Sequence, residues 1–113
     1  MKLQELVDSL SLEVKTASFN LTKEVTGGYV SDLLSDVIAN SKEGNIWVTL
    51  QTHQNIVAVA TLRELSGIIL VNNRTPDTET LKKAEEEGLP IMVSPLPAFE
   101  LVGRLYSLGL RCQ

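Results

Sequence analysis

The sequence has 113 residues, 43% of them hydrophobic and 21% charged, which is enough apolar material for the core of one domain spanning residues 1–113. Its net charge of −4 argues against a nucleic-acid partner, because neutralising phosphates needs clustered Lys and Arg. We expect a cytoplasmic protein without membrane or metal partners, because it has no apolar run of the about 20 residues that cross a bilayer, no signal-peptide pattern at its start, and one cysteine, Cys112.

The first part of the chain alternates between helical and extended patterns. Apolar residues at helical spacing predict an amphipathic helix over residues 2–10, and alternation over residues 12–14 predicts a short strand. Residues 16–23 are mostly polar and indicate a connection. The next helical face, at residues 30–38, predicts a helix with Ser31 as its N-cap.

Three apolar runs in the second part predict strands that are covered on both faces, at residues 46–50, 68–71 and 91–93. Helices of ten or more residues are expected between them, so the strands require crossover connections and a parallel arrangement. Such crossovers are right-handed. The sequence therefore predicts a three-layer α/β/α domain with a largely parallel or mixed sheet.

The helices between these strands have recognisable ends. A helix at residues 56–65 is expected to end before Gly67, and the next should begin with Thr75 as N-cap and Pro76 in its first position, and close at Gly88. A last helix at about residues 97–108 is expected to present four apolar side chains to the core: Phe99, Val102, Leu105 and Tyr106.

Polar residues follow each covered strand, where the ligand crevice of an open α/β sheet lies. These candidate ligand-binding residues are Gln51, Thr52, His53, Gln54, Asn55, Asn72, Arg74 and Ser94. The first of the three loops leads into a helix N-terminus, which is a natural place for an anion. Residues of this kind also cap helices and face water without any ligand, so both interpretations stay open.

His53 and Arg74 have the most distinctive chemistry in these loops. His53 is the only histidine in the chain, so no metal site is expected; it could act with a carboxylate as an acid–base pair or simply cap a helix. Arg74 could hold a phosphate or carboxylate in bidentate fashion, or belong to a solvated turn.

The tripeptide Thr26, Gly27, Gly28 is the most informative short motif. Adjacent glycines permit positive φ, so their amides could form an anion-binding nest beside the Thr26 hydroxyl. They equally permit close backbone packing or a bulge. We favour the structural interpretation, in which Gly27 and Gly28 adopt a backbone conformation closed to other residues.

No recognisable catalytic motif is present. The sequence contains no P-loop, no G-x-G-x-x-G, no G-x-S-x-G and no H-E-x-x-H pattern. We therefore expect a protein that is not an enzyme and needs no cofactor. The acidic run at residues 85–87 is typical of a solvated helix face.

The segments 24–34 (EVTGGYVSDLL) and 47–51 (WVTLQ) resemble the DRTGG domain family. The likeness extends over nearly the whole chain, and the T-G-G matches, whereas the family's leading Asp-Arg is Glu24-Val25 here. The resemblance implies the fold of the N-terminal domain of HPr kinase/phosphorylase, which is similar to that of the N-terminal domain of MurF ligase.

The resemblance also implies a role. Family members occur alone, beside CBS-domain pairs, in phosphotransacetylases and ahead of the HPr kinase catalytic domain, whose P-loop this chain lacks. We expect a non-catalytic regulatory or oligomerisation module, a homodimer, that senses a small anionic metabolite or nucleotide. The alternatives are a scaffold that docks a partner enzyme or kinase without its own ligand, and an enzyme that uses His53.

Overall fold

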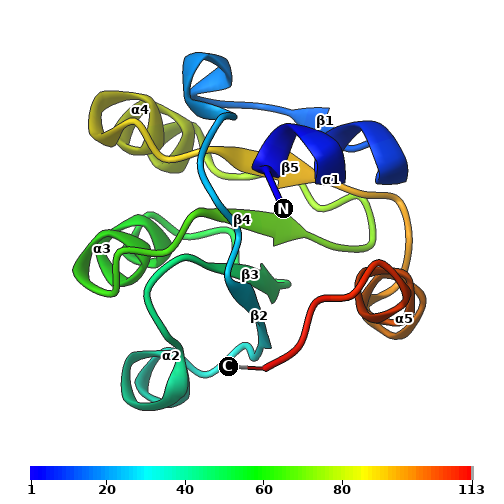
Figure 1. Cartoon of the computed structure of the whole chain (residues 1–113). Helices are drawn as coiled ribbons and strands as arrows, with labels where there is room; N and C mark the ends of the chain where they lie inside the picture. Colours follow the sequence, from blue (N-terminus) through cyan, green and yellow to red (C-terminus); the bar gives the residue numbers. More distant parts are fainter. Residues whose placement is uncertain (113) are drawn as a thin grey trace.

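Five strands form one mixed sheet in the computed structural model, which describes residues 1–112 (Figure 1). The strand order is β1-β5-β4-β3-β2, and only β1, at one edge, runs antiparallel to its neighbour. The strands are β1 (Glu13–Val14), β2 (Gly27–Val30), β3 (Asn45–Thr49), β4 (Gly67–Leu70) and β5 (Ile91–Val93). The parallel part, β2 to β5, is built in chain order, so each crossover connects adjacent strands.

Helices cover both faces of the sheet (Figure 1). One face carries α2 (Leu34–Asn40), α3 (Asn55–Leu62) and α4 (Thr78–Glu87), and the other carries α1 (Leu3–Leu10) and α5 (Ala98–Ser107). The predicted three-layer α/β/α architecture is therefore confirmed. Among the described residues, no helix is long and apolar enough to span a membrane.

The core is divided by the sheet into two apolar clusters. On β3, Ile46 and Val48 pack toward α1 and α5, whereas Trp47 packs toward α2 and α3. All five residues of β3 are buried. This alternation follows from the two-residue period of a strand and explains why β3 has no polar face.

Several predicted elements are confirmed with small shifts. The helix at 2–10 is α1, and the three covered strands are β3, β4 and β5. Gly88 ends α4 in the left-handed conformation, with φ +67°, as a helix-closing glycine should. The connection at 16–23 includes one turn of 3-10 helix, Ser18–Asn20.

The helix predicted from Ser31 begins later than expected. Val30 belongs to β2, where it pairs with Val48 of β3, and it is 47% exposed. The prediction that Val30 shares a helix with Leu34 and Val37 was therefore wrong, because pairing with β3 determines the conformation of residue 30. Ser31 accepts a hydrogen bond from the Leu33 amide, at 3.1 Å, one turn before α2.

Two other helix boundaries and one helix face also differ from the prediction. Helix α4 begins at Thr78 with Asp77 in the N-cap position, two residues after the expected N-cap Thr75. Helix α3 ends at Leu62, because Glu64 turns into the left-handed conformation. On α5 the buried residues are Leu101 and Leu105, so the predicted core face was wrong for Phe99 and Tyr106.

Candidate functional site

The two groups of predicted site residues lie at opposite ends of the parallel strands. The motif at residues 26–28 stands at the amino end of β2, where Gly27 pairs with Asn45 at the start of β3. The loops after β3, β4 and β5 stand at the carboxyl ends of the parallel strands. The structure therefore does not combine the motif and the loops into one site.

The T-G-G motif forms no anion-binding nest. Gly27 and Gly28 are part of strand β2, and neither has a positive φ. The amide of Gly28 donates to the carbonyl oxygen of Arg111 at 3.1 Å, so this edge of β2 is partly covered by the C-terminal segment. The expectation that the glycines adopt a conformation closed to other residues was wrong.

The Thr26 hydroxyl, offered above as a ligand donor, serves the neighbouring turn instead. It donates to the carbonyl oxygen of Glu43 at 2.8 Å and accepts from the side-chain amide of Asn45 at 3.3 Å. Gly44 lies in this turn with φ +82°, and a Cβ placed there would be 2.7 Å from Cγ2 of Thr26. The glycine with the conformational requirement is therefore Gly44.

We expect Gly44→Ala to lower the free energy of unfolding by about 1–3 kcal/mol, because it combines an unfavourable φ with a steric clash. Gly28→Ala is the matched control, since its Cβ would lie at an ordinary 3.5 Å from the side chain of Ile46. Urea denaturation of both variants measures the difference. Equal losses in the two variants would refute this assignment.

The three loops at the carboxyl ends form one continuous surface. The amide of Asp77 donates to the carbonyl oxygen of Thr52 at 3.2 Å, which joins the loops after β3 and β4. The amides of Asn72 and Asn73 donate to the carbonyl oxygens of Leu96 and Ser94, at 2.9 and 2.8 Å, which joins the loops after β4 and β5. Both asparagines have φ near +55°.

Several polar side chains of these three loops already form hydrogen bonds within the chain. His53 accepts a hydrogen bond from the Asn55 amide at its Nδ1, at 3.1 Å, so it caps the start of α3 as the capping interpretation predicts. Gln51 donates from its side-chain amide to the Asp32 carbonyl oxygen at 2.9 Å, and the buried Ser94 hydroxyl accepts from the Leu96 amide at 3.1 Å. These contacts hold the loops in place.

Other polar side chains of the same loops face solvent. Among the residues that the structure describes, we find no hydrogen bond or ion pair from four exposed side chains, those of Gln54, Asn55, Asn72 and Arg74. Arg74 is the only Lys or Arg in these loops. This carboxyl-end surface therefore offers one cation and three amides to a ligand.

Two side chains on or beside β2, Tyr29 and Asp36, have shifted pKa values. Hydrogen bonds from Ser31, Tyr29 and Asn40 hold the pKa of the Asp36 carboxyl below its usual value. The Tyr29 hydroxyl donates to that carboxylate at 2.9 Å, which raises the pKa of Tyr29. The cluster ties β2 to α2, and it is a structural contact rather than a second site.

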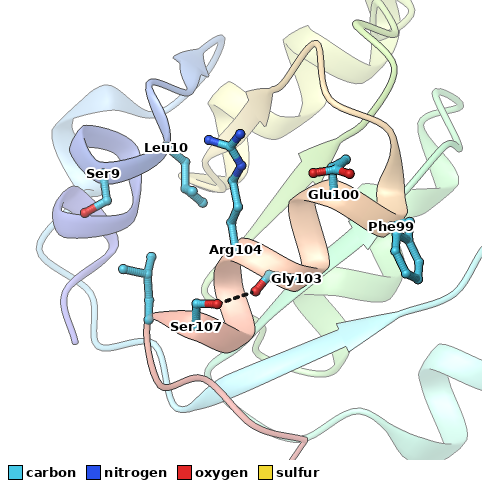
Figure 2. A pocket seen from close by; sticks show the side chains of 8 residues that line it. Ser9, Leu10, Phe99, Glu100, Gly103, Arg104 and Ser107 are labelled. Atoms are coloured by element: carbon cyan, nitrogen blue, oxygen red, sulfur yellow. Dashed lines mark hydrogen bonds between the residues drawn. The ribbon is translucent and has the colours of Figure 1, made fainter.

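Two cavities flank α5, and sequence reasoning missed both. The larger, about 510 Å³, lies between α1 and α5, and Figure 2 shows Arg104 and Glu100 rising from α5 beside it. The smaller, about 330 Å³, lies between β2 and α5 and includes Gly28 and Tyr106. No sequence motif marks them, because they depend on which face of α5 is turned outward.

The smaller cavity is poorly suited to an anion. Its lining is mostly apolar, and its one cation, Arg111, stacks on the Tyr106 ring at 3.7 Å from the centroid. The Arg111 guanidinium also donates to the carbonyl oxygens of Tyr106 and Leu110, both at 2.9 Å. Arg111 is therefore already engaged within the chain.

Comparison with known proteins identifies a fold. No protein-family model and no curated protein matches the sequence. Among solved structures, the CBS and DRTGG domains of the regulatory region of Clostridium perfringens pyrophosphatase, complexed with the activator diadenosine tetraphosphate, align over 97% of this chain. The TM-score is 0.73 and the sequence identity 19%. The fold is DRTGG-like.

This similarity has a limited extent. The DRTGG-like chain spans 47% of the neighbour's length, and the neighbour belongs to the regulatory region of an enzyme rather than to a catalytic domain. The predicted DRTGG resemblance is supported at the level of the fold. The narrower likeness to HPr kinase/phosphorylase receives no support from these comparisons.

Proposed function

We propose that this chain is a non-catalytic regulatory module of the cytoplasm that senses a small anionic metabolite or nucleotide and associates with itself. One observation carries the proposal: the chain shares its fold with the regulatory region of a pyrophosphatase that was crystallised with a nucleotide activator. The absence of recognisable catalytic motifs agrees with a regulatory rather than an enzymatic role.

The carboxyl-end surface is the proposed ligand site. Arg74 supplies a guanidinium that pairs with phosphate or carboxylate oxygens in a bidentate manner. The amides of Gln54, Asn55 and Asn72 offer further donors, and the N-terminus of α3 favours a negative charge nearby. The backbone hydrogen bonds between the loops hold the main chain that carries these side chains.

We expect a nucleotide ligand to raise the melting temperature. At one hundred times its dissociation constant, a ligand stabilises the folded state by about 2.7 kcal/mol. Differential scanning fluorimetry with diadenosine tetraphosphate, ATP, ADP and inorganic phosphate provides the test. Arg74→Gln should abolish the shift or weaken binding more than tenfold, whereas Lys82→Gln, which removes an exposed charge from α4, should leave it unchanged.

The alternative function is a scaffold without a ligand of its own, which docks a partner enzyme or kinase. It is favoured by the exposed aromatic side chains of α5, since apolar groups at a surface often mark interfaces. If no compound of the panel shifts the melting temperature, the sensing proposal is wrong and the scaffold function is preferred. Equal shifts in Arg74→Gln and the parent would instead place the ligand elsewhere.

A further inference from the structure

The outer side of helix α5 exposes two large aromatic side chains. Phe99 is 90% exposed and Tyr106 58% exposed, and these two aromatic residues lie seven positions apart, on one side of the helix. Gly103 lies between them at the centre of the outer side. We call the surface formed by Phe99, Glu100, Gly103, Arg104 and Tyr106 the α5 face.

Within residues 1–112, no close contact explains Gly103. A Cβ placed on it would meet no atom within 4 Å outside the adjoining helix backbone. A glycine inside a helix costs about 1 kcal/mol relative to alanine. Such a residue is useful where another backbone must approach closely, and Gly103 leaves room for that approach at the α5 face.

The charges of the α5 face are arranged around the same glycine. Glu100 and Arg104 lie one helical turn apart on the side of α5 that faces α1, and Phe99 projects from the other side (Figure 2). Within residues 1–112 neither Glu100 nor Arg104 forms an ion pair. The face thus carries one charge of each sign beside an aromatic pair.

We propose that the α5 face binds the α5 face of a second copy, antiparallel, across a two-fold axis at Gly103. This inference rests on the self-association proposed above and names its surface. A two-fold axis perpendicular to both helices places the charged side of one α5 against the charged side of the other. The two aromatic sides meet in the same way. Glu100 of one copy then meets Arg104 of the other, and Phe99 meets Tyr106, twice each.

The same geometry brings the two Gly103 backbones together at the crossing. A buried Phe or Tyr contributes about 150–250 Å² of surface, so the two aromatic residues supply a large part of the about 800 Å² that each partner buries in a standard interface. The antiparallel orientation has an advantage, because it places each Glu100 near Arg104 of the other copy, whereas a parallel pair would place the charged side of one helix against the aromatic side of the other. A second copy therefore fits this face in both shape and charge.

Sedimentation velocity of the full chain, over a concentration series, tests the proposal. We expect a dimer for the parent and a dissociation constant raised at least tenfold in Gly103→Glu, which places bulk and like charges at the axis. Ala58→Glu, on the exposed side of α3 across the sheet, is the matched control and should dimerise like the parent. Circular dichroism should show that both variants remain folded.

Charge reversal provides a second test that does not depend on Gly103. Glu100→Arg and Arg104→Glu should each weaken the dimer, because each places like charges opposite one another, and the double variant should restore it. A dimer that none of these changes affects would overturn the α5 face alone. A parent that stays monomeric would overturn self-association as well, without bearing on the ligand test at Arg74.

Discussion

Trp47→Ala is expected to lower the free energy of unfolding by about 3–5 kcal/mol, as truncation of a large core aromatic residue does. Trp47 is fully buried on β3 and packs against the helices on the α2–α4 side of the sheet. Its indole nitrogen donates to the Ser31 carbonyl oxygen at 2.9 Å. The substitution therefore opens a cavity and leaves that carbonyl oxygen without its partner.

Trp47→Phe separates these two effects. The smaller ring still fills much of the space but donates no hydrogen bond to Ser31, so we expect a smaller loss than for alanine. Urea denaturation with circular dichroism measures both variants against the parent. A loss below about 1 kcal/mol for Trp47→Ala would contradict the burial on which the two-sided core depends.

The covered strands could be predicted from sequence because their burial leaves an unambiguous pattern. Every residue of 46–50 except Thr49 is apolar, and no arrangement other than a strand or helix buried on all sides accommodates such a run. The intervening helices then required crossovers, and crossovers required a parallel sheet. The strand order did not follow, since nothing in a single sequence states which strands are neighbours.

Strand β2 could not be predicted, because its conformation depends on a distant partner. Val30 continued the helical spacing of Leu34 and Val37, and only pairing with Val48 of β3 extends the chain there. The same cause misplaced the role of Gly27 and Gly28. The pair of adjacent glycines suggested positive φ, whereas the positive φ of this region belongs to Gly44 on the adjoining segment.

The location of the polar loops could be predicted from the sequence, but the side chains that remain free in them could be predicted only in part. The polar loops do lie together at the carboxyl ends of the strands, as the α/β topology requires. Which side chains stay free was not predictable, since His53 and Gln51 are occupied by contacts within their own or a neighbouring loop. Phe99 and Tyr106 were expected in the core because apolar spacing alone does not tell a buried stripe from an exposed one.

Thr16→Val is expected to destabilise the fold strongly, although it conserves the shape of the side chain. The Thr16 hydroxyl is buried, donates to the Leu89 carbonyl oxygen at 2.7 Å and accepts from the Ile91 amide at 2.9 Å. Valine leaves both backbone groups unpaired beside the start of β5. An unsatisfied buried group costs about 1–3 kcal/mol, so the expected loss is about 2–6 kcal/mol.

Thr22→Val is the matched control, because Thr22 is exposed and the same methyl-for-hydroxyl exchange there should change stability by less than about 0.5 kcal/mol. Amide hydrogen exchange adds a local measurement. In Thr16→Val the Ile91 amide should lose protection before the amides of β3 and β4, since this amide donates directly to the Thr16 hydroxyl at the start of β5. Unchanged protection at Ile91, with a stability equal to that of Thr22→Val, would show that the hydroxyl does not hold this edge of the sheet.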